Sequence, residues 1–268
     1  MKEQNERDNI DSRENIDIDT TETEGLSQDA LPSADAKPKK TRKDSREAIR
    51  RVTGIAVFSA LAFVVALVCQ IIPPVAGFLS LDFKDAVIAM ASFIYGPVSA
   101  VIIALIAAFI ELVTISSTGW YGFVMNFISS AVFSLVASLI YRKLKSINGA
   151  LVAFFAAILT TTSVMLLMNI FVTPLYMAEI GVPLGSDGVI AMIPRVLLPF
   201  NFSKALLNSA GAMILYKPLA TGLRHIGFAS GDKKAMTFNR GTLITIIVGI
   251  ISLILAILIL VLIPQTGA

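Results

Sequence analysis

The segment Pro-Phe-Asn-Phe-Ser-Lys-Ala-Leu-Leu-Asn, residues 199–208, places strongly polar side chains inside a long apolar run. Asn201, Lys204 and Asn208 are spaced i, i+3 and i+7, so they project from one face of a helix. In a membrane such groups need a partner or a wet cavity. This stripe predicts the hydrogen-bonding wall of a ligand cavity. The alternative is a packing seam in which asparagines join helices, but the lysine favours the cavity.

Three further polar residues lie near the same ends of other apolar runs: Glu111, Asn126 and Asn169. With Asn201 and Lys204 they would converge from four helices at a similar depth. Such a pocket is rich in amide donors and acceptors and suits a neutral, polar, planar molecule. Glu111 has an equally weighted alternative, which is to pair with Lys204 or to reach the membrane interface.

Two loops are predicted beside this pocket. The segment Ser-Ser-Thr-Gly-Trp-Tyr-Gly, residues 116–122, carries Trp120 and Tyr121, which are either ligand-stacking rings or interface anchors. The segment Leu-Asp-Phe-Lys-Asp, residues 81–85, is either a lid or a capped helix entry in which Asp82 or Asp85 is the cap.

Motifs of catalytic and metal sites are missing from the sequence. No G-x-x-x-x-G-K-[ST] phosphate loop occurs, and neither H-E-x-x-H nor G-x-S-x-G occurs in an apolar run. His225 has no second ligand nearby and Cys69 is the single cysteine, so we expect no metal site, disulfide or cofactor. The chain is predicted not to be an enzyme.

The elements that position these residues are membrane helices. The 268 residues are 55% hydrophobic and 15% charged, whereas soluble domains carry about 25% charged residues. A helix needs about 20 apolar residues to cross a bilayer. The candidate spans are 52–72, a short or tilted helix at 86–96, 98–115, 122–141, 149–175, 196–216 and 242–263. The stretch 177–194 contains several glycines and prolines and is predicted to be a loop or a re-entrant segment.

The charges are distributed unevenly along the chain. Residues 1–35 carry a net charge of −8, and residues 36–51 carry +6. The polar segment 1–48 has no apolar period and is predicted to be disordered. The basic block before the first span, with Arg142, Lys143, Lys145 and the basic residues of 217–240, predicts a cytoplasmic N-terminus and an outside C-terminus in the cell membrane. Nucleic acid is not an expected partner.

Several of these passages resemble the S component, or substrate-binding subunit, of energy-coupling factor (ECF) transporters of the riboflavin-binding type. They are Ala56-x-x-x-Ala60, where small residues let another helix approach, and Leu81–Asp85 followed by Tyr95-Gly-Pro97. The loop running from Ser117 to Asn126 and the segment from Pro199 to Asn208, leading to Tyr216-Lys-Pro-Leu219, complete the resemblance. It covers about residues 50–220.

This resemblance implies an all-α membrane protein that captures riboflavin or a close flavin from outside. Asn169, Asn201 and Lys204 would bond the isoalloxazine ring, with Asn126, Asn208, Asp82 and Tyr121 as further contacts. Ala56 and Ala60 would pack on a partner transmembrane subunit driven by two ATPases, which use the ATP. The predicted organisation is a disordered charged cytoplasmic tail (1–48), a six-helix S-component membrane domain (49–220), a cytoplasmic linker (221–241) and one extra C-terminal transmembrane helix (242–263).

Two other functions stay open at this point. An S component for another vitamin or a nucleobase, such as thiamine or folate, would keep the same architecture. A membrane enzyme or scaffold, with a catalytic or structural polar stripe, belongs to a different class and lacks an evident acid–base pair or nucleophile.

Overall fold

The computed structural model describes residues 42–144, 146–225 and 240–263, without the side chains of 42–44, 147 and 216–225. The predicted disorder of 1–41, most of the basic linker 221–241 and the side chains of Tyr216–Leu219 therefore lie outside the described residues. Where the tail and the structure overlap, the prediction is wrong, because residues 42–48 are helical. A helix already formed by an apolar span extends at one hydrogen bond per residue without a new nucleation cost.

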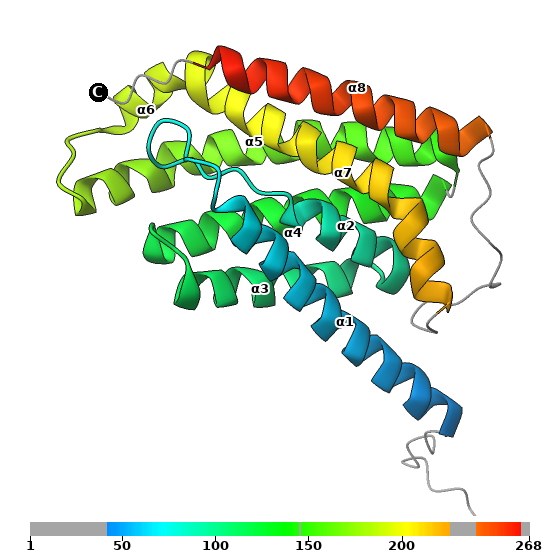
Figure 1. Cartoon of the computed structure of the whole chain (residues 1–268). Coiled ribbons are helices and arrows are strands. Elements are labelled where there is room, and N and C mark those ends of the chain that lie inside the picture. The colour runs from blue at the N-terminus through cyan, green and yellow to red at the C-terminus, as the bar shows by residue number, and fades with distance from the viewer. Residues whose placement is uncertain (1–41, 145, 226–239, 264–268) are drawn as a thin grey trace, which may run out of the picture. The chain divides into compact units, whose positions relative to one another are not determined.

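The described residues are almost entirely helical and contain no strand (Figure 1). The helices are α1 (Arg42–Cys69), α2 (Lys84–Tyr95), α3 (Pro97–Thr114), α4 (Gly119–Leu144), α5 (Ile147–Glu179), α6 (Ser186–Met192), α7 (Leu198–His225) and α8 (Arg240–Leu262), with a π-helical turn (Ile193–Leu197) between α6 and α7. The expected six-helix bundle with one added C-terminal helix is therefore present, and α6 extends α7 at its N-terminal end.

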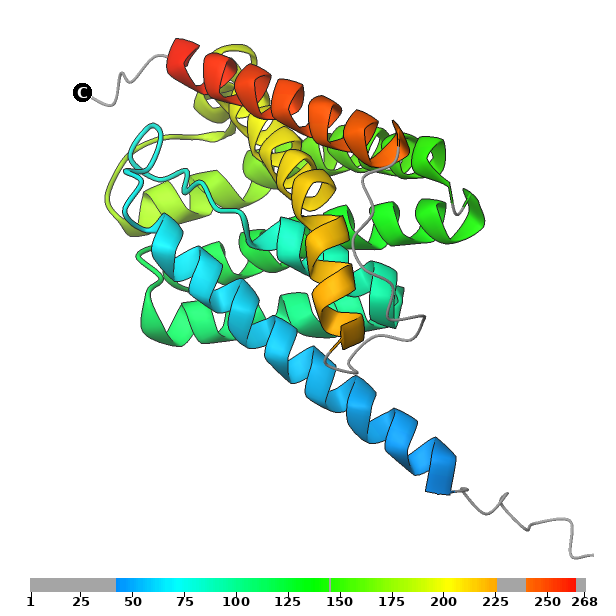
Figure 2. The ribbon, with the colours of Figure 1, turned by 45° about the vertical axis from the view of Figure 1, so that its right-hand side comes forward.

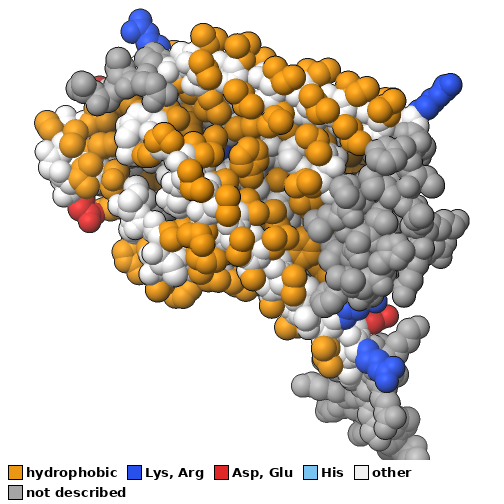
Figure 3. Space-filling model, viewed as in Figure 1, with side chains coloured by type: hydrophobic (Ala, Val, Ile, Leu, Met, Phe, Trp, Pro, Cys, Tyr) orange, Lys and Arg blue, Asp and Glu red, His pale blue; other side chains and the backbone are white. Residues whose placement is uncertain are grey.

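Six of the described helical segments are long and apolar enough to cross a membrane: 45–69, 97–114, 119–144, 148–179, 186–215 and 240–262. Apolar side chains cover most of the described part of the face in Figure 3, and charged side chains lie at its edges. The exception is α2, whose 12 residues extend about 18 Å at 1.5 Å per residue. This length is well short of the roughly 30 Å hydrocarbon core, in accord with the short helix predicted at 86–96.

Residues 177–194 were predicted to be a loop or a re-entrant segment, and the loop prediction is wrong at both ends. Helix α5 continues to Glu179, and α6 begins at Ser186, so the connection is limited to 180–185. The helical path from α6 to α7 continues through Pro194, which lies in the π-helical turn Ile193–Leu197. A widened turn accommodates a proline ring and its missing N–H more easily than a regular α-helical turn.

Helix α2 is the central element of the bundle. It packs against α1, α3, α4 and α7, and its residues from Lys84 to Ser92 are all buried. The connection 70–83 reaches its first turn through a tight reversal, in which Val75 and Leu79 exchange two backbone hydrogen bonds. The start of α2 is therefore placed inside the bundle, next to α3, α4 and α7.

Helix α8 packs along α7 and touches α5. Gly249 permits this close approach, because a Cβ at that position would lie 2.8 Å from Ile214 Cγ1. Figures 1 and 2 both place α8 on the side of the bundle away from α1 and α3. The added helix thus does not cover the exposed face of α1.

Candidate functional site

A cavity of about 670 Å³, including its part open to solvent, lies among α4, α5, α7 and the connection 70–83. Its polar lining includes Ser80, Thr118, Asn126, Ser129, Asn169, Thr173, Asn201 and Lys204. Methionine, valine and phenylalanine side chains form much of the remaining wall. The lining is typical of small-molecule sites, which are mostly apolar with a few placed polar groups. We call it the first cavity.

The two buried amides of this cavity are oriented by their own helices. Asn169 Nδ2 donates to the Met165 carbonyl at 2.7 Å, and Thr173 Oγ1 donates to Asn169 Oδ1 at 2.9 Å. Asn201 Nδ2 donates to the Leu197 carbonyl at 2.8 Å. Since a side-chain amide has two N–H donors, each of these amides keeps a second N–H for a ligand. The pair therefore offers N–H donors to a polar ligand in the cavity.

Lys204 lines the same cavity and is held by an ion pair. Its Nζ lies 2.9 Å from Asp82 Oδ2, in the connection 70–83, and 3.5 Å from the Ser80 carbonyl. Burial by itself would raise the pKa of the Asp82 carboxyl, but the ammonium groups of Lys204 and Lys84 outweigh burial and lower this pKa to about 2. Asp82 is therefore an anion that positions Lys204.

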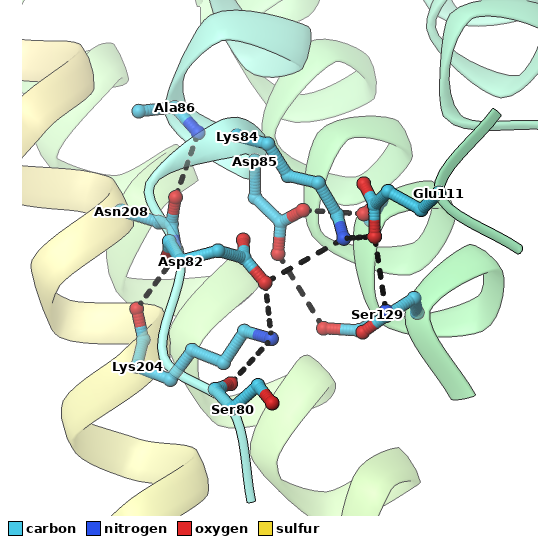
Figure 4. A network of polar contacts seen from close by, with 11 residues as sticks. Ser80, Asp82, Lys84, Asp85, Ala86, Glu111, Ser129, Lys204 and Asn208 are labelled. Carbon is cyan, nitrogen blue, oxygen red and sulfur yellow. Dashed lines mark hydrogen bonds and ion pairs between the residues drawn. The ribbon is translucent and has the colours of Figure 1, made fainter. Parts of the chain in front are cut away.

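A second ion pair adjoins the first, and sequence reasoning missed it. Lys84 Nζ lies 2.7 Å from Glu111 Oε2 and 3.5 Å from Asp82 Oδ2 (Figure 4). The alternative in which Glu111 pairs with Lys204 is thus corrected: its partner is Lys84. Lys84 is 1% exposed, although the segment 81–85 was predicted to be a lid or a capped helix entry. No signal in the sequence indicates its burial.

Asp85 is also part of this network and does not cap α2. Ser129 Oγ donates to Asp85 Oδ2 at 3.4 Å, and Ser130 Oγ donates to Asp85 Oδ1. The N-cap residue of α2 is Phe83, which provides no side-chain cap. The network therefore contains three carboxylates (Asp82, Asp85, Glu111) and two lysines (Lys84, Lys204), an excess of one acidic group.

Asn208 does not line the first cavity. It is fully buried, and its Nδ2 donates to the carbonyls of Asp82 and Lys204, each at 3.0 Å. Its Oδ1 accepts from the Ala86 N–H at 2.9 Å. Of the helix face Asn201, Lys204 and Asn208, the structure thus brings the first two to the cavity. The third connects α7 to the start of α2.

The loop predicted over 116–122 ends earlier than expected, because α4 begins at Gly119, and its two aromatic residues take different positions on the first turn of that helix. Tyr121 lines the first cavity, with its ring centroid 6.0 Å from that of Tyr176 on α5. Trp120 is 67% exposed and packs edge-on against Phe123. The exposed ring of Trp120 favours the interface-anchor interpretation, whereas Tyr121 is available to a ligand.

Ala56 and Ala60 lie on an exposed face of α1. The neighbouring exposed residues of this face include Val57, Leu61 and Val64. The opposite face of α1, with Phe58 and Ala62, is buried against the bundle. A smooth face with two small residues four positions apart is suited to close helix packing.

Comparison with known proteins identifies the family. The model for the substrate-specific component of ECF transporters matches residues 50–216. The riboflavin transporter RibU of Staphylococcus aureus (strain TCH60) is 30% identical over 186 residues, which cover 69% of this chain and 98% of RibU. The riboflavin transporter FmnP of Bacillus subtilis (strain 168) is 26% identical over 163 residues, covering 59% of this chain and 86% of FmnP.

A solved structure, described as the S component of a bacterial ECF transporter, has the same fold. It matches with a TM-score of 0.55 at 30% identity, and the match covers 66% of this chain and 99% of that chain. The solved protein is therefore matched over nearly its whole length, while about a third of this chain lies outside the match.

Proposed function

The chain belongs to the family of substrate-specific components of ECF transporters, and we propose that it captures riboflavin from outside the cell for uptake. It is a multi-pass membrane protein and a transporter component. The observation that carries the proposal is the first cavity, in which the amides of Asn169 and Asn201 and the Lys204 ammonium face a largely apolar space.

The chemistry of a flavin ring matches this lining. The isoalloxazine ring has a pyrimidine end with alternating carbonyl and N–H groups, and a dimethylbenzene end without polar atoms. Asn169, Asn201 and Lys204 offer donors and acceptors to the first end. Met125, Met165 and Val172 offer an apolar surface to the second. The Tyr121 and Tyr176 rings line the same cavity and would add aromatic contacts to the flavin.

Uptake needs an energy source that this chain does not carry, because its sequence has no phosphate-binding loop. The proposed partners are an ECF transmembrane subunit and two ABC-type ATPases, which use ATP on its behalf. The exposed α1 face around Ala56 and Ala60 is the proposed contact with the transmembrane subunit. The open side of α1, opposite α8, supports this assignment (Figure 2).

The proposed orientation places the N-terminus in the cytoplasm and the C-terminus outside. Arg46, Arg50 and Arg51 at the start of α1 and Arg142 and Lys143 at the end of α4 would then lie on the cytoplasmic side. This distribution agrees with the positive-inside rule. The first cavity would open at the opposite, external side.

Equilibrium binding to the detergent-purified full chain tests the function. We expect riboflavin to bind tightly and to raise the unfolding temperature by mass action. Lys204→Ala should weaken binding about tenfold to a hundredfold, since a charge-assisted hydrogen bond contributes about 1.5–3 kcal/mol. Arg195→Ala, which removes an exposed cation outside the cavity, is the matched control and should not change the affinity.

The proposal fails if riboflavin neither binds nor stabilises the wild-type chain. A panel of thiamine, folate and nucleobases in the same stability assay then identifies an S component for a different ligand. Turnover of a bound compound would indicate a membrane enzyme.

A further inference from the structure

A second cavity, of about 780 Å³ including its open part, lies beside the first. It is enclosed by the ends of α1 and α3 and the start of α4, with Ala66, Ala108 and Phe123 in its walls. Ser80, Thr118 and Asn126 line both cavities. The two cavities therefore adjoin each other at these three residues.

The second cavity has a different polar lining from the first. Asp82 and Glu111 both line it, and each side chain is 8% exposed. Asp82 Oδ2 and Glu111 Oε2 are held by lysines, and Figure 4 shows the Lys84 ammonium between the two carboxylates. Within the described part of the chain, the other two oxygens, Asp82 Oδ1 and Glu111 Oε1, make no hydrogen bond.

Buried acceptors without a donor are unfavourable, so this cavity favours a ligand that brings hydrogen-bond donors. The hydroxyl groups of Ser116, Ser117 and Thr118 add both donors and acceptors to its lining. Asn126, which lines both cavities, donates a hydrogen bond from its Nδ2 to Glu111 Oε2 of the second cavity at 3.1 Å. A neutral chain of hydroxyl groups meets these requirements, whereas an anionic group would meet two carboxylates.

We propose that the second cavity binds the ribityl chain of riboflavin while the first holds its ring, an inference that rests on the proposed function. The ribityl hydroxyls would donate to Asp82 and Glu111, which gives the buried acid groups a role in ligand selection. Glu111 and Asp82 are then specificity residues for the hydroxylated chain, and the amides of the first cavity are specificity residues for the ring.

The test compares riboflavin with lumiflavin, which has the same ring but a methyl group in place of the ribityl chain. Both ligands are titrated against the full chain in detergent. Glu111→Gln removes the charge at constant shape and should weaken riboflavin binding about tenfold to a hundredfold. It should leave lumiflavin binding within about threefold. Asp187→Asn, the matching acid-to-amide change at an exposed residue of α6, should alter neither affinity.

A second variant distinguishes loss of the ribityl site from a general destabilisation caused by losing the Lys84–Glu111 ion pair. Ala108→Leu places bulk in the wall of the second cavity and leaves every charge of the network in place. It should also weaken riboflavin binding at least tenfold while lumiflavin binding is retained. Retained lumiflavin binding shows that a variant is folded.

Two results overturn the inference while the proposed function stands. One is an equal loss of both ligands in these variants, and the other is unchanged riboflavin affinity. Equal affinity of the wild-type chain for riboflavin and lumiflavin would likewise exclude a bound ribityl chain. If the wild-type chain binds neither flavin, the proposed function itself fails, and this inference fails with it.

Discussion

The side-chain oxygen of Asn208, on α7, accepts a hydrogen bond from the backbone N–H of Ala86, in the first turn of α2, at 2.9 Å. The first N–H groups of a helix have no partner in their own helix. Here a residue more than a hundred positions away supplies one of the missing acceptors, and the predicted caps Asp82 and Asp85 bind elsewhere. The same amide donates to the carbonyls of Asp82 and Lys204. Asn208 therefore ties the ligand-facing lysine, its aspartate and the start of α2 together.

Asn208→Ala should lower stability without removing a ligand contact. The change leaves a buried N–H and two carbonyls without these hydrogen bonds, which costs about 1–3 kcal/mol. The measurement is thermal unfolding of the ligand-free chain in detergent. Asn148→Ala removes an exposed asparagine and should change stability by less than about 0.5 kcal/mol. Equal stability of the two variants would show that the Asn208 hydrogen bonds contribute nothing.

Lys84 and Glu111 should be strongly coupled, because their ion pair is buried. Lys84→Met leaves carboxylates without their cation, and such a change costs about 3–5 kcal/mol. The double variant Lys84→Met/Glu111→Gln should be more stable than Lys84→Met alone, since it also removes the unpaired charge. A double-mutant cycle from chemical unfolding measures the coupling. Simple additivity of the two changes would argue against the pair.

The two faces of α1 should respond differently to added bulk. Ala56→Leu with Ala60→Leu enlarges an exposed face, so ligand binding and stability should persist while assembly with the proposed transmembrane partner subunit is lost. Gly54→Leu should destabilise the chain itself, because a Cβ there would overlap the Tyr95 ring of α2. Copurification and thermal unfolding distinguish the two effects. Normal assembly of the Ala56→Leu/Ala60→Leu variant would exclude this face as the partner contact.

Gly249→Leu should separate α8 from α7. A Cβ at Gly249 would lie 2.8 Å from Ile214 Cγ1 and 3.3 Å from the Ala210 carbonyl oxygen, so the helices must move apart. We expect a lower unfolding temperature with unchanged riboflavin affinity, because α8 lines neither described cavity. Ile251→Ala, on the exposed face of α8, is the control. A large loss of affinity in Gly249→Leu would give α8 a direct role in the site.

The sequence by itself was sufficient to predict the long apolar helices and an amide-lined cavity, but not α6 or the first turns of α1. Long apolar runs must form helices in a bilayer, because no water is present to satisfy their backbone groups. Helical periodicity placed Asn201 and Lys204 on one face, and both line the first cavity. The helix boundaries were less predictable where the chain stays helical through a proline, as it does at Pro194 in the π-helical turn.

Only the tertiary structure decided which polar groups meet. Two lysines and three acids occur in this region, and their spacing along the chain does not specify that Glu111 pairs with Lys84 and Asp82 with Lys204. That pairing depends on how deeply the connection 70–83 enters the bundle, which is set by the packing of the short α2 among four other helices. Asn208 illustrates the same limit: periodicity placed it on the polar face, and packing against α2 gave it a partner other than the cavity. The physical reason is that periodicity fixes the direction of a side chain within its own helix, whereas contacts depend on the relative depth of separate elements.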